Sequence, residues 1–414
     1  MLVYLLGAAL AFGAQDTVRI SLGEATTRAM AVSPELISAH GAVAAPRGAR
    51  AELAWPFPSA PLLTFSRANR TSPTTQAVDR SYSIRQEIDV TGRSFVLAGA
   101  AAKRITAAES RVEDASRVVI RDTELAFLRL WTMERRAALL DSAAQTSERL
   151  AEIGRIRLEA GAIDRLEANA VLVDAGRQRS MAERAAVDRA GAAAELGRIL
   201  NFPADSVLRT TGLDQLQDVR LPPLAELIAG AVGRRPDLAA AEMELIASDR
   251  DVVASRLGLL PRLEIGYDWG NEAIENLRGF SVGVRVPLFQ RNQAERGAMH
   301  ANRVAAGANV EATRRGIAAE ISDAYARWNG ARAVQQRLAQ DVLRAASDNV
   351  ALSQRALEEG RIAIPDVLFL RSVAVAAQIE YLNVVQDMHA ARFALAAALG
   401  VRSDDLQSLG EIAP

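Results

Sequence analysis

Few residues in this chain have the types and spacing that chemistry at a site requires. The three histidines stand apart from one another in the sequence: His40, His300 and His389. Met299 and His300 are neighbours and could together contact a soft metal ion. We interpret them as a pair on the surface of a helix, which is the commoner arrangement. The sequence therefore predicts no metal site and no bound cofactor.

Nucleophilic and phosphate-binding motifs are absent as well. Ser33, Ser81 and Asp89 lack the spacing of a nucleophile elbow. The sequence contains neither a Gly-Lys-Ser/Thr phosphate loop nor a His-Glu-x-x-His zinc motif. It has no cysteine, which excludes disulfides, thiolate metal sites, a cysteine nucleophile and lipidation of an N-terminal cysteine. We therefore predict that the protein is not an enzyme.

Composition favours long packed helices over an enzyme core. Half of the 414 residues are hydrophobic but only 5% are aromatic, and Ala, Leu and Val dominate the apolar share. The 49 basic and 50 acidic residues are interleaved, which gives a net charge of −1. No basic tract indicates binding of nucleic acid.

The N-terminal segment from Met1 to Ala14 is short, apolar and ends in small residues, which is typical of a secretory signal peptide. A short buried helix is the alternative. Further along the chain we find no run of about 18 consecutive apolar residues, the length that a membrane-spanning helix needs. Any passage through a membrane would then require a β-barrel.

An internal repeat organises the chain. Ser33-Pro34-Glu35-Leu36 recurs as Arg235-Pro236-Asp237-Leu238 at an offset of 202. Three further landmarks recur in the same order at offsets of 200, 198 and 199: Pro61 with Pro261, Arg93 with Arg291, and Gly161 with Gly360. A unit of this length indicates a duplicated domain rather than a solenoid. We predict a first repeat at 15–220, a second at 221–401 and a tail at 402–414.

Each repeat contains two short segments with period-two alternation. In the second repeat, Val282, Val284 and Val286 alternate with Gly283 and Arg285. Segments at about 62–67, 82–90 and 262–269 follow a similar pattern, although Gln86 interrupts one apolar face. One apolar and one charged face suit strands between lipid and a watery lumen, although a soluble half-buried hairpin would look the same locally.

Helices make up the rest of each repeat. We expect one helix at about 21–53 and another at about 223–257, ahead of the strands. Proline-free stretches at about 94–159 and 294–359 predict helices about 90 Å long, which must pack lengthwise against others. Gly161 and Gly360 can take the left-handed conformation that ends a helix, and return helices follow at about 164–200 and 366–399.

These residues resemble those of the TolC-like outer-membrane efflux proteins, from about Ile20 to Val401. The segment from Val284 to Gln293 is most similar to the heavy-metal branch of that family, which serves cobalt–zinc–cadmium or copper–silver pumps. The resemblance implies a mainly α fold with a small β part. Two long antiparallel coiled-coil hairpins would form a periplasmic tunnel, and four strands per chain would join a 12-stranded barrel in the outer membrane of a homotrimer.

The resemblance also implies partners and sites. A periplasmic membrane-fusion adaptor would dock at the hairpin tips, and an inner-membrane RND-type pump would load substrates, either metal cations or drugs. The tip residues are Gly161, Ala162, Ile163, Gly360, Arg361 and Ile362. Val282, Val284 and Val286 would face the lipid.

A periplasmic gate would place Asp366 of each chain at the tunnel axis, as a ring of carboxylates. Phe369 stands where some relatives carry a second acid, and Arg361 is the nearest candidate for the basic residue that holds the closed state. The alternative for Asp366 is a simple first-turn acid favoured by the helix dipole.

A periplasmic coiled-coil adaptor or scaffold without a barrel is the alternative function. Adaptors have one helical hairpin beside lipoyl-like strands, whereas this sequence predicts two hairpins of about equal length.

Overall fold

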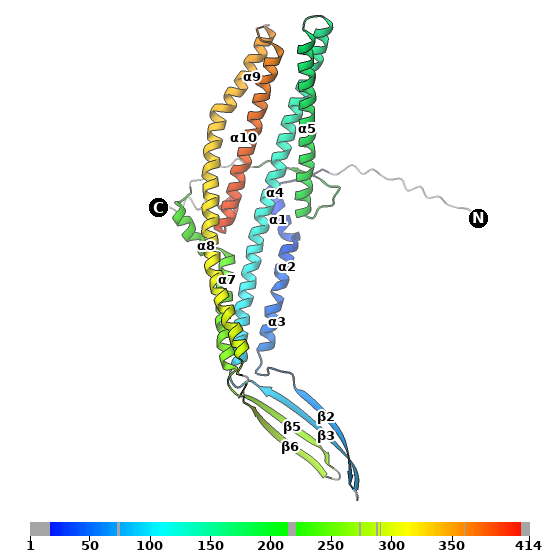
Figure 1. Cartoon of the computed structure of the whole chain (residues 1–414), viewed down its shortest axis with the longest axis vertical. Coiled ribbons are helices and arrows are strands. Elements are labelled where there is room, and N and C mark those ends of the chain that lie inside the picture. Colours follow the sequence, from blue (N-terminus) through cyan, green and yellow to red (C-terminus); the bar gives the residue numbers. More distant parts are fainter. Residues whose placement is uncertain are drawn as a thin grey trace, which may run out of the picture. The chain divides into compact units, whose positions relative to one another are not determined.

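The computed structural model describes residues 17–72, 75–213, 221–272, 275–286, 289, 291–359 and 361–406 (Figure 1). The proposed signal segment, Gly360 and most of the tail at 402–414 lie outside the described residues. The chain forms two compact units. The hairpin unit consists of Met1–Leu36, Ser116–Arg234 and Ala318–Pro414. The strand unit consists of Ile37–Ala115 and Arg235–Ile317. Each unit therefore draws on both halves of the sequence.

The strand unit contains one antiparallel sheet with the order β2-β3-β5-β6, visible as four adjacent strands in Figure 1. The strands are β2 (Leu62–Ser72), β3 (Thr75–Ile88), β5 (Arg262–Glu272) and β6 (Glu275–Arg285). Each predicted strand is present, and each is longer than its alternating core. With 11 to 14 residues, they are at least as long as a tilted membrane strand needs, which is about 9 to 11 residues.

The helices that precede the strands are broken, whereas we expected two continuous ones. The segment at 21–53 forms α1 (Leu22–Val32), α2 (Pro34–Ala42) and α3 (Ala44–Leu53). The segment at 223–257 forms α6 (Leu224–Val232) and α7 (Pro236–Leu257). The residue before each proline, Ser33 or Arg235, is extended, with ψ of 123° and 115°. Proline disfavours the helical conformation in the residue before it, which explains the breaks at Ser33 and Arg235. The third break, at Val43 between α2 and α3, keeps a helical backbone with ψ of −24° and has no proline directly after it.

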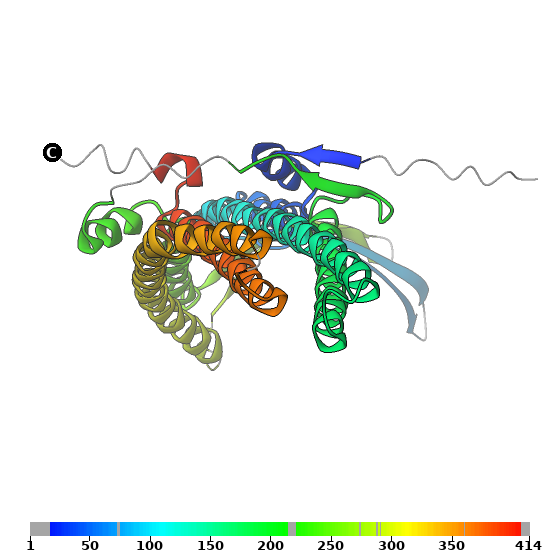
Figure 2. The ribbon, with the colours of Figure 1, turned by 90° about the horizontal axis from the view of Figure 1, so that it is seen from above.

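The long helices form two hairpins, seen from above in Figure 2. In the first, α4 (Arg93–Glu159) runs for 67 residues and α5 (Arg165–Ile199) returns. In the second, α8 (Gln293–Arg337) and α9 (Leu343–Glu358) are separated by a π-helical turn at Leu338–Val342, and α10 (Ile364–Leu399) returns. The predicted continuous helix at 294–359 is therefore wrong at this turn.

The core of the hairpin unit consists of small and branched side chains between helices. Ala137, Leu140 and Ala144 of α4 pack on Ala182 and Ala185 of α5. Alanine lets the helix axes approach closely, as in a coiled coil. The low aromatic content of the sequence reflects this mode of packing.

Two short elements of the hairpin unit have no counterpart in the sequence predictions. Strand β1 (Thr17–Ile20) pairs in parallel with β4 (Val207–Thr210). A 3-10 turn at Ser403–Asp405 follows α10. There the Ser403 hydroxyl donates to the carboxylate of Glu124 on α4. Burial raises the pKa of Glu124 to about 7, although the hydrogen bond from Ser403 opposes this shift.

Among the described residues, α10 is the one helix whose length and composition would allow it to cross a membrane. We expected none, because its apolar run is interrupted by single polar residues. In the structure α10 packs against α5, α6 and α9, and its buried residues are concentrated toward its C-terminal end, from His389 to Leu399.

Candidate functional site

The first candidate site is the sheet, whose two faces differ in chemistry. Register places Leu63, Ile84, Tyr267 and Phe280 in one row across the four strands. The next rows toward the strand bases are Gln86-Ile265-Val282 and Ile88-Leu263-Val284. All these residues share one face, because side chains alternate along a strand. We call it the apolar face.

The apolar face is open to its surroundings. Phe280 is 89% exposed and Val282 is 70% exposed. Val284 lies beside Val282 on the same face, and Val286 follows the end of β6 and is also exposed. Contiguous exposed apolar surface marks contact with lipid or with another protein. Gln86 interrupts the face as the sequence indicates, and its amide donates to the backbone oxygens of Ser59 at 2.8 Å and Glu87 at 2.9 Å.

Aromatic side chains cross this face at one level of the strands. Phe65 and Tyr82 have ring centroids 5.0 Å apart, and Tyr82 stacks on Trp269 at 5.6 Å. In the neighbouring row, Tyr267 contacts Phe280 at 4.9 Å. Such rows are typical of the interfacial level of membrane strands, where amphipathic rings lie beside headgroups.

The opposite face is polar and its charges are paired. Arg262 bonds Glu87 at 3.0 Å, Arg285 pairs with Glu264 at 3.4 Å and Arg85 with Asp268 at 3.8 Å. Near the hairpin ends, Arg70 bonds Asp79 at 3.0 Å. Paired charges on one face and apolar side chains on the other are what a wall between water and lipid requires.

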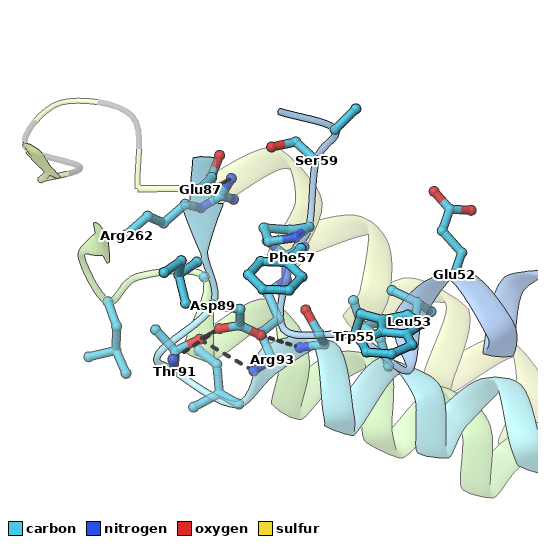
Figure 3. Close-up of a pocket in the computed structure, with 18 residues that line it drawn as sticks. Glu52, Leu53, Trp55, Phe57, Ser59, Glu87, Asp89, Thr91, Arg93 and Arg262 are labelled. Atoms are coloured by element: carbon cyan, nitrogen blue, oxygen red, sulfur yellow. Dashed lines mark hydrogen bonds and ion pairs between the residues drawn. The ribbon is translucent and has the colours of Figure 1, made fainter. Parts of the chain in front are cut away.

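A cavity of about 540 Å³ lies at the base of the sheet, where the strands meet the helices of the same unit (Figure 3). Its lining includes Trp55, Phe57 and Arg262. Beside it, Asp89 accepts hydrogen bonds from the Thr91 N–H at 2.9 Å, from the Thr91 hydroxyl and from the Ser94 N–H. Burial would raise the pKa of Asp89, but these hydrogen bonds outweigh it and hold the pKa at about 2. Asp89 therefore fixes the turn from β3 into α4 as a charged group.

The hairpin tips are the second candidate site. Gly161 has φ of +69°, and the Ala162 N–H donates to the Arg157 oxygen at 2.8 Å, which closes α4 in the manner of a Schellman motif. In the second hairpin, the Arg361 N–H donates to the Ala356 oxygen at 2.8 Å. Both hydrogen bonds span the same number of residues. Ile163 is half-buried, as is Ile362.

The predicted gate residues lie close together in sequence but do not contact one another. Asp366 is exposed in the first turn of α10, where its backbone N–H donates to the Ala363 oxygen at 3.2 Å, and its side chain has no hydrogen bond or ion pair within the described residues. Phe369 is 66% exposed one turn later. Arg361 pairs with Glu359 at 3.0 Å rather than with Asp366. In a single chain, Asp366 and Phe369 are therefore open to solvent or to other copies.

A contact between the two hairpins near the tips was not visible in the sequence. Val171 of α5 packs against Ile364 and Leu368 of α10. Glu167 of α5 accepts the Ile364 N–H at 3.4 Å. Glu167 and Asp366 are 199 residues apart, so they occupy equivalent first-turn positions in the two repeats. That offset of 199 residues is the signal in the sequence that relates Glu167 to Asp366.

The described residues hold no group of three or more His, Asp or Glu side chains that could bind a metal ion. His300 is exposed on α8. His389 is buried between Trp131 and Phe393, with ring centroids 6.1 and 6.2 Å away. Burial, together with the charge of Arg392, lowers the pKa of His389 to about 4, so this histidine is a neutral core residue.

Comparison with known proteins gives one family and a consistent fold. The pattern of the outer membrane efflux protein family matches residues 227–401. The chain is 30% identical over 155 residues to the pyoverdine export outer membrane protein OpmQ of Pseudomonas putida, covering 35% of this chain and 32% of that protein. It is 28% identical over 255 residues to the outer membrane protein OprJ of Pseudomonas aeruginosa, covering 58% and 52%. The matches thus span between a third and about half of the length of these curated relatives.

Solved structures are similar over nearly the whole chain. A membrane protein from Pseudomonas aeruginosa has a TM-score of 0.78 at 22% identity, covering 92% of this chain and 90% of that one. The CmeC outer membrane channel of Campylobacter jejuni has a TM-score of 0.80 at 16% identity, covering 92% and 85%. The fold is therefore mainly helical with a small sheet, as predicted, and is shared with outer-membrane channels. Together with the family match, it gives the chain an outer-membrane location.

Proposed function

We propose that this chain is an outer membrane efflux protein that assembles as a homotrimer and forms the exit channel of a tripartite efflux system. The observation that carries the proposal is the four-stranded sheet with one exposed apolar face and one ion-paired face. Its edge strands β2 and β6 each pair on one side only. Three such sheets joined edge to edge would give 12 strands and remove every open edge.

The proposal also includes the partners and the substrates of the channel. The tip residues described above would dock a periplasmic adaptor, which connects the channel to an inner-membrane RND-type pump. Metal cations are the substrates that the segment from Val284 to Gln293 favours. The relatives include a pyoverdine exporter, so drugs or other small molecules are the alternative cargo.

A soluble scaffold or adaptor is the rival function, and the apolar face argues against it. A soluble protein rarely leaves a contiguous apolar surface of this kind open to water. Phe280 and Val282 would need a cover that no element of the described chain provides.

Two measurements test the proposal. The detergent-extracted protein should have the mass of a trimer, and a stable monomer in detergent-free buffer would contradict it. In reconstituted protein, Val284→Arg should destabilise the barrel by about 2 to 4 kcal/mol if the residue lies near the midplane of the bilayer. Gly283→Arg is the matched control, because a side chain there points to the polar face and has room beside Glu264. Equal tolerance of both changes would overturn the assignment of the faces.

A further inference from the structure

Three arginines lie on the apolar face of the sheet, where the described strands place no Asp or Glu. Arg67, Arg80 and Arg278 alternate in register with Phe65, Tyr82 and Phe280, so they point to the same side as the apolar residues. All three are exposed, and none has an ion pair within the described residues. We call them the outer arginines.

The charges on the two faces of the sheet are sorted in an unusual way. Within the described strands, every Asp and Glu points to the polar face: Asp79, Glu87, Glu264, Asp268, Glu272 and Glu275. The arginines of that face are paired with them, as Arg70 is with Asp79. The apolar face therefore carries positive charge without acidic residues, whereas the polar face carries ion pairs and a small excess of acidic residues.

Two of the outer arginines stand directly opposite each other. Arg67 on β2 is the register partner of Arg80 on β3. Like charges in directly opposed positions destabilise a sheet, and an anion between two arginines would offset that repulsion. Arg262 and Arg285 are opposed in the same way on the polar face, but each is paired with a glutamate there, whereas Arg67 and Arg80 have no ion pair within the described residues. A guanidinium pair of this kind matches the oxygens of a phosphate group, which arginine binds through two parallel hydrogen bonds. The unpaired opposition of Arg67 and Arg80 therefore favours an anionic ligand.

The surroundings identify the ligand as a lipid. The row below Arg67 and Arg80 is aromatic, with the ring centroids of Phe65 and Tyr82 5.0 Å apart, and Arg278 lies at that lower level as the partner of Trp269. From Tyr82 down to Ile88 the apolar face covers seven residues of β3, and the six steps between them span about 20 Å at about 3.3 Å per residue. That is close to the height of the lipid-facing band of membrane strands, about 25 Å. A phosphate on the arginines would leave its acyl chains beside the aromatic row.

The ends of the strands identify the leaflet. The Leu62 and Ile88 ends of β2 and β3 continue into helices, whereas the outer arginines lie toward the β-hairpin ends. If the helices are periplasmic, the hairpins point outward. The geometry points to a binding surface for a phosphate-bearing lipid of the outer leaflet, centred on Arg67 and Arg80, with Arg278 in the same positive band. This inference rests on the proposed barrel.

The experiment uses the full-length protein extracted as a trimer, with bound lipids counted by native mass spectrometry. The probes are lipid A with two phosphates and dephosphorylated lipid A with the same acyl chains. The native protein should prefer the phosphorylated probe, and Arg67→Gln combined with Arg80→Gln should reduce that preference about tenfold, because two charge-assisted contacts are lost. Arg278→Gln should have a smaller effect. Lysine at positions 67 and 80 should keep part of the preference, since it retains charge without the bidentate geometry.

Arg70→Gln is the matched control, because Arg70 lies near the same level of β2 but is paired on the polar face. Equal loss in this variant would show a response to net charge alone and would overturn the inference. So would an unchanged preference after substitution of Arg67 and Arg80, or displacement of the lipid by millimolar inorganic phosphate. A trimer that inserts into liposomes without any phosphate preference refutes this inference alone. A chain that neither trimerises nor inserts refutes the proposed function with it.

Discussion

The two helical hairpins share one plan but differ in local structure. The helix that ends at Glu159 is continuous, whereas its counterpart is interrupted at Leu338–Val342 by a π-helical turn. In the first hairpin the return helix α5 is capped by Asp164, whose side chain accepts the Glu167 N–H at 2.8 Å. In the second, the capping position before α10 is Ala363, which offers no side-chain cap.

The π turn does not lengthen the second hairpin arm. Gly360 follows Arg291 by 69 residues and Gly161 follows Arg93 by 68, but the helices begin at Arg93 and at Gln293, so the arm Gln293–Glu358 has 66 residues against 67 for Arg93–Glu159. A π turn closes its hydrogen bond over one more residue than an α turn, so it changes the rotation of the helix that follows without breaking that helix. The two tips keep the same i to i−5 closing bond, from Ala162 to Arg157 and from Arg361 to Ala356.

The contacts between the two arms of each hairpin differ as well. Arg179 of α5 bonds Glu148 of α4 at 2.6 Å and Asp141 at 3.1 Å. Within the described residues we find no such ion pair between α9 and α10. Exposed ion pairs contribute little each, so the cap and the helix geometry matter more. We infer that the first hairpin is locally the more stable one, and that the hairpin carrying Asp366 opens more readily. The following predictions test this difference.

The largest expected effect lies in the hairpin cores. Leu140 is 2% exposed and packs against α5, whereas Leu338, which follows Arg291 as Leu140 follows Arg93, is only half-buried in the π turn. Leu140→Ala should lower the local opening free energy of the first hairpin by about 3 kcal/mol, because it leaves a cavity. Leu338→Ala should cost about 1 kcal/mol in the second hairpin. Hydrogen exchange of the hairpin amides measures both, and equal costs would show that the cores are equally packed.

Helix capping gives the next effect, and it should have opposite signs in the two hairpins. Asp164→Ala removes the acceptor for the Glu167 N–H and should cost about 1 kcal/mol in the first turn of α5. Ala363 has the extended backbone of a cap, with ψ of 155°, so Ala363→Ser should stabilise the first turn of α10 by about 0.5 kcal/mol. Serine adds no charge beside Asp366. Amide exchange rates in the first turns of α5 and α10 check both changes. If Ala363→Ser does not slow exchange in the first turn of α10, the cap argument is refuted.

A smaller effect is expected from removal of one residue of the π turn. Deletion of Ala339 shortens Leu338–Val342 by one residue and should convert the π turn into regular α-helix. Amide exchange at 338–343 should then slow toward that of the middle of α4, while the tip at Arg361 stays unchanged. Faster exchange throughout α9 would mean that Ala339 is needed for packing.

The sequence predicted the elements that have a strong periodic pattern and missed those that depend on distant partners. The strands containing Val284 and Leu263 were predictable, because alternation alone assigns each side chain to a face. The breaks at Ser33 and Arg235 could have been predicted from the following prolines. The pairing of β1 with β4 could not, because four-residue strands have no distinctive period and pair across nearly the whole first repeat.

In the candidate sites, too, the sequence shows local patterns but not contacts between distant segments. The opposition of Arg67 and Arg80 requires the register of two strands, which alternation within each strand does not give. The contact of Val171 with Ile364 and Leu368 joins helices from different repeats, so no local pattern reports it. The role of Asp366 as a gate residue remains a prediction, because what its side chain faces depends on other copies of the chain.

The last prediction concerns Asp366 and compares the tips directly. If three copies of Asp366 converge on the tunnel axis, their like charges attract cations, as acidic rings do in channels. Asp366→Asn should then weaken the block of single-channel current by added divalent cations in planar bilayers. It should change stability by only a few tenths of a kcal/mol, because the side chain makes no hydrogen bond within the described residues.

Glu167→Gln is the matched control. It alters the equivalent first-turn acid of the first hairpin, which is held by the Ile364 N–H at 3.4 Å, and it should leave the block intact. A first-turn acid that only favours the helix dipole predicts the opposite for Asp366: slight destabilisation of α10 and an unchanged block. If both variants weaken the block equally, the acids of the two hairpins share one ring and the tips do not differ in function. If neither does, Asp366 is not the gate.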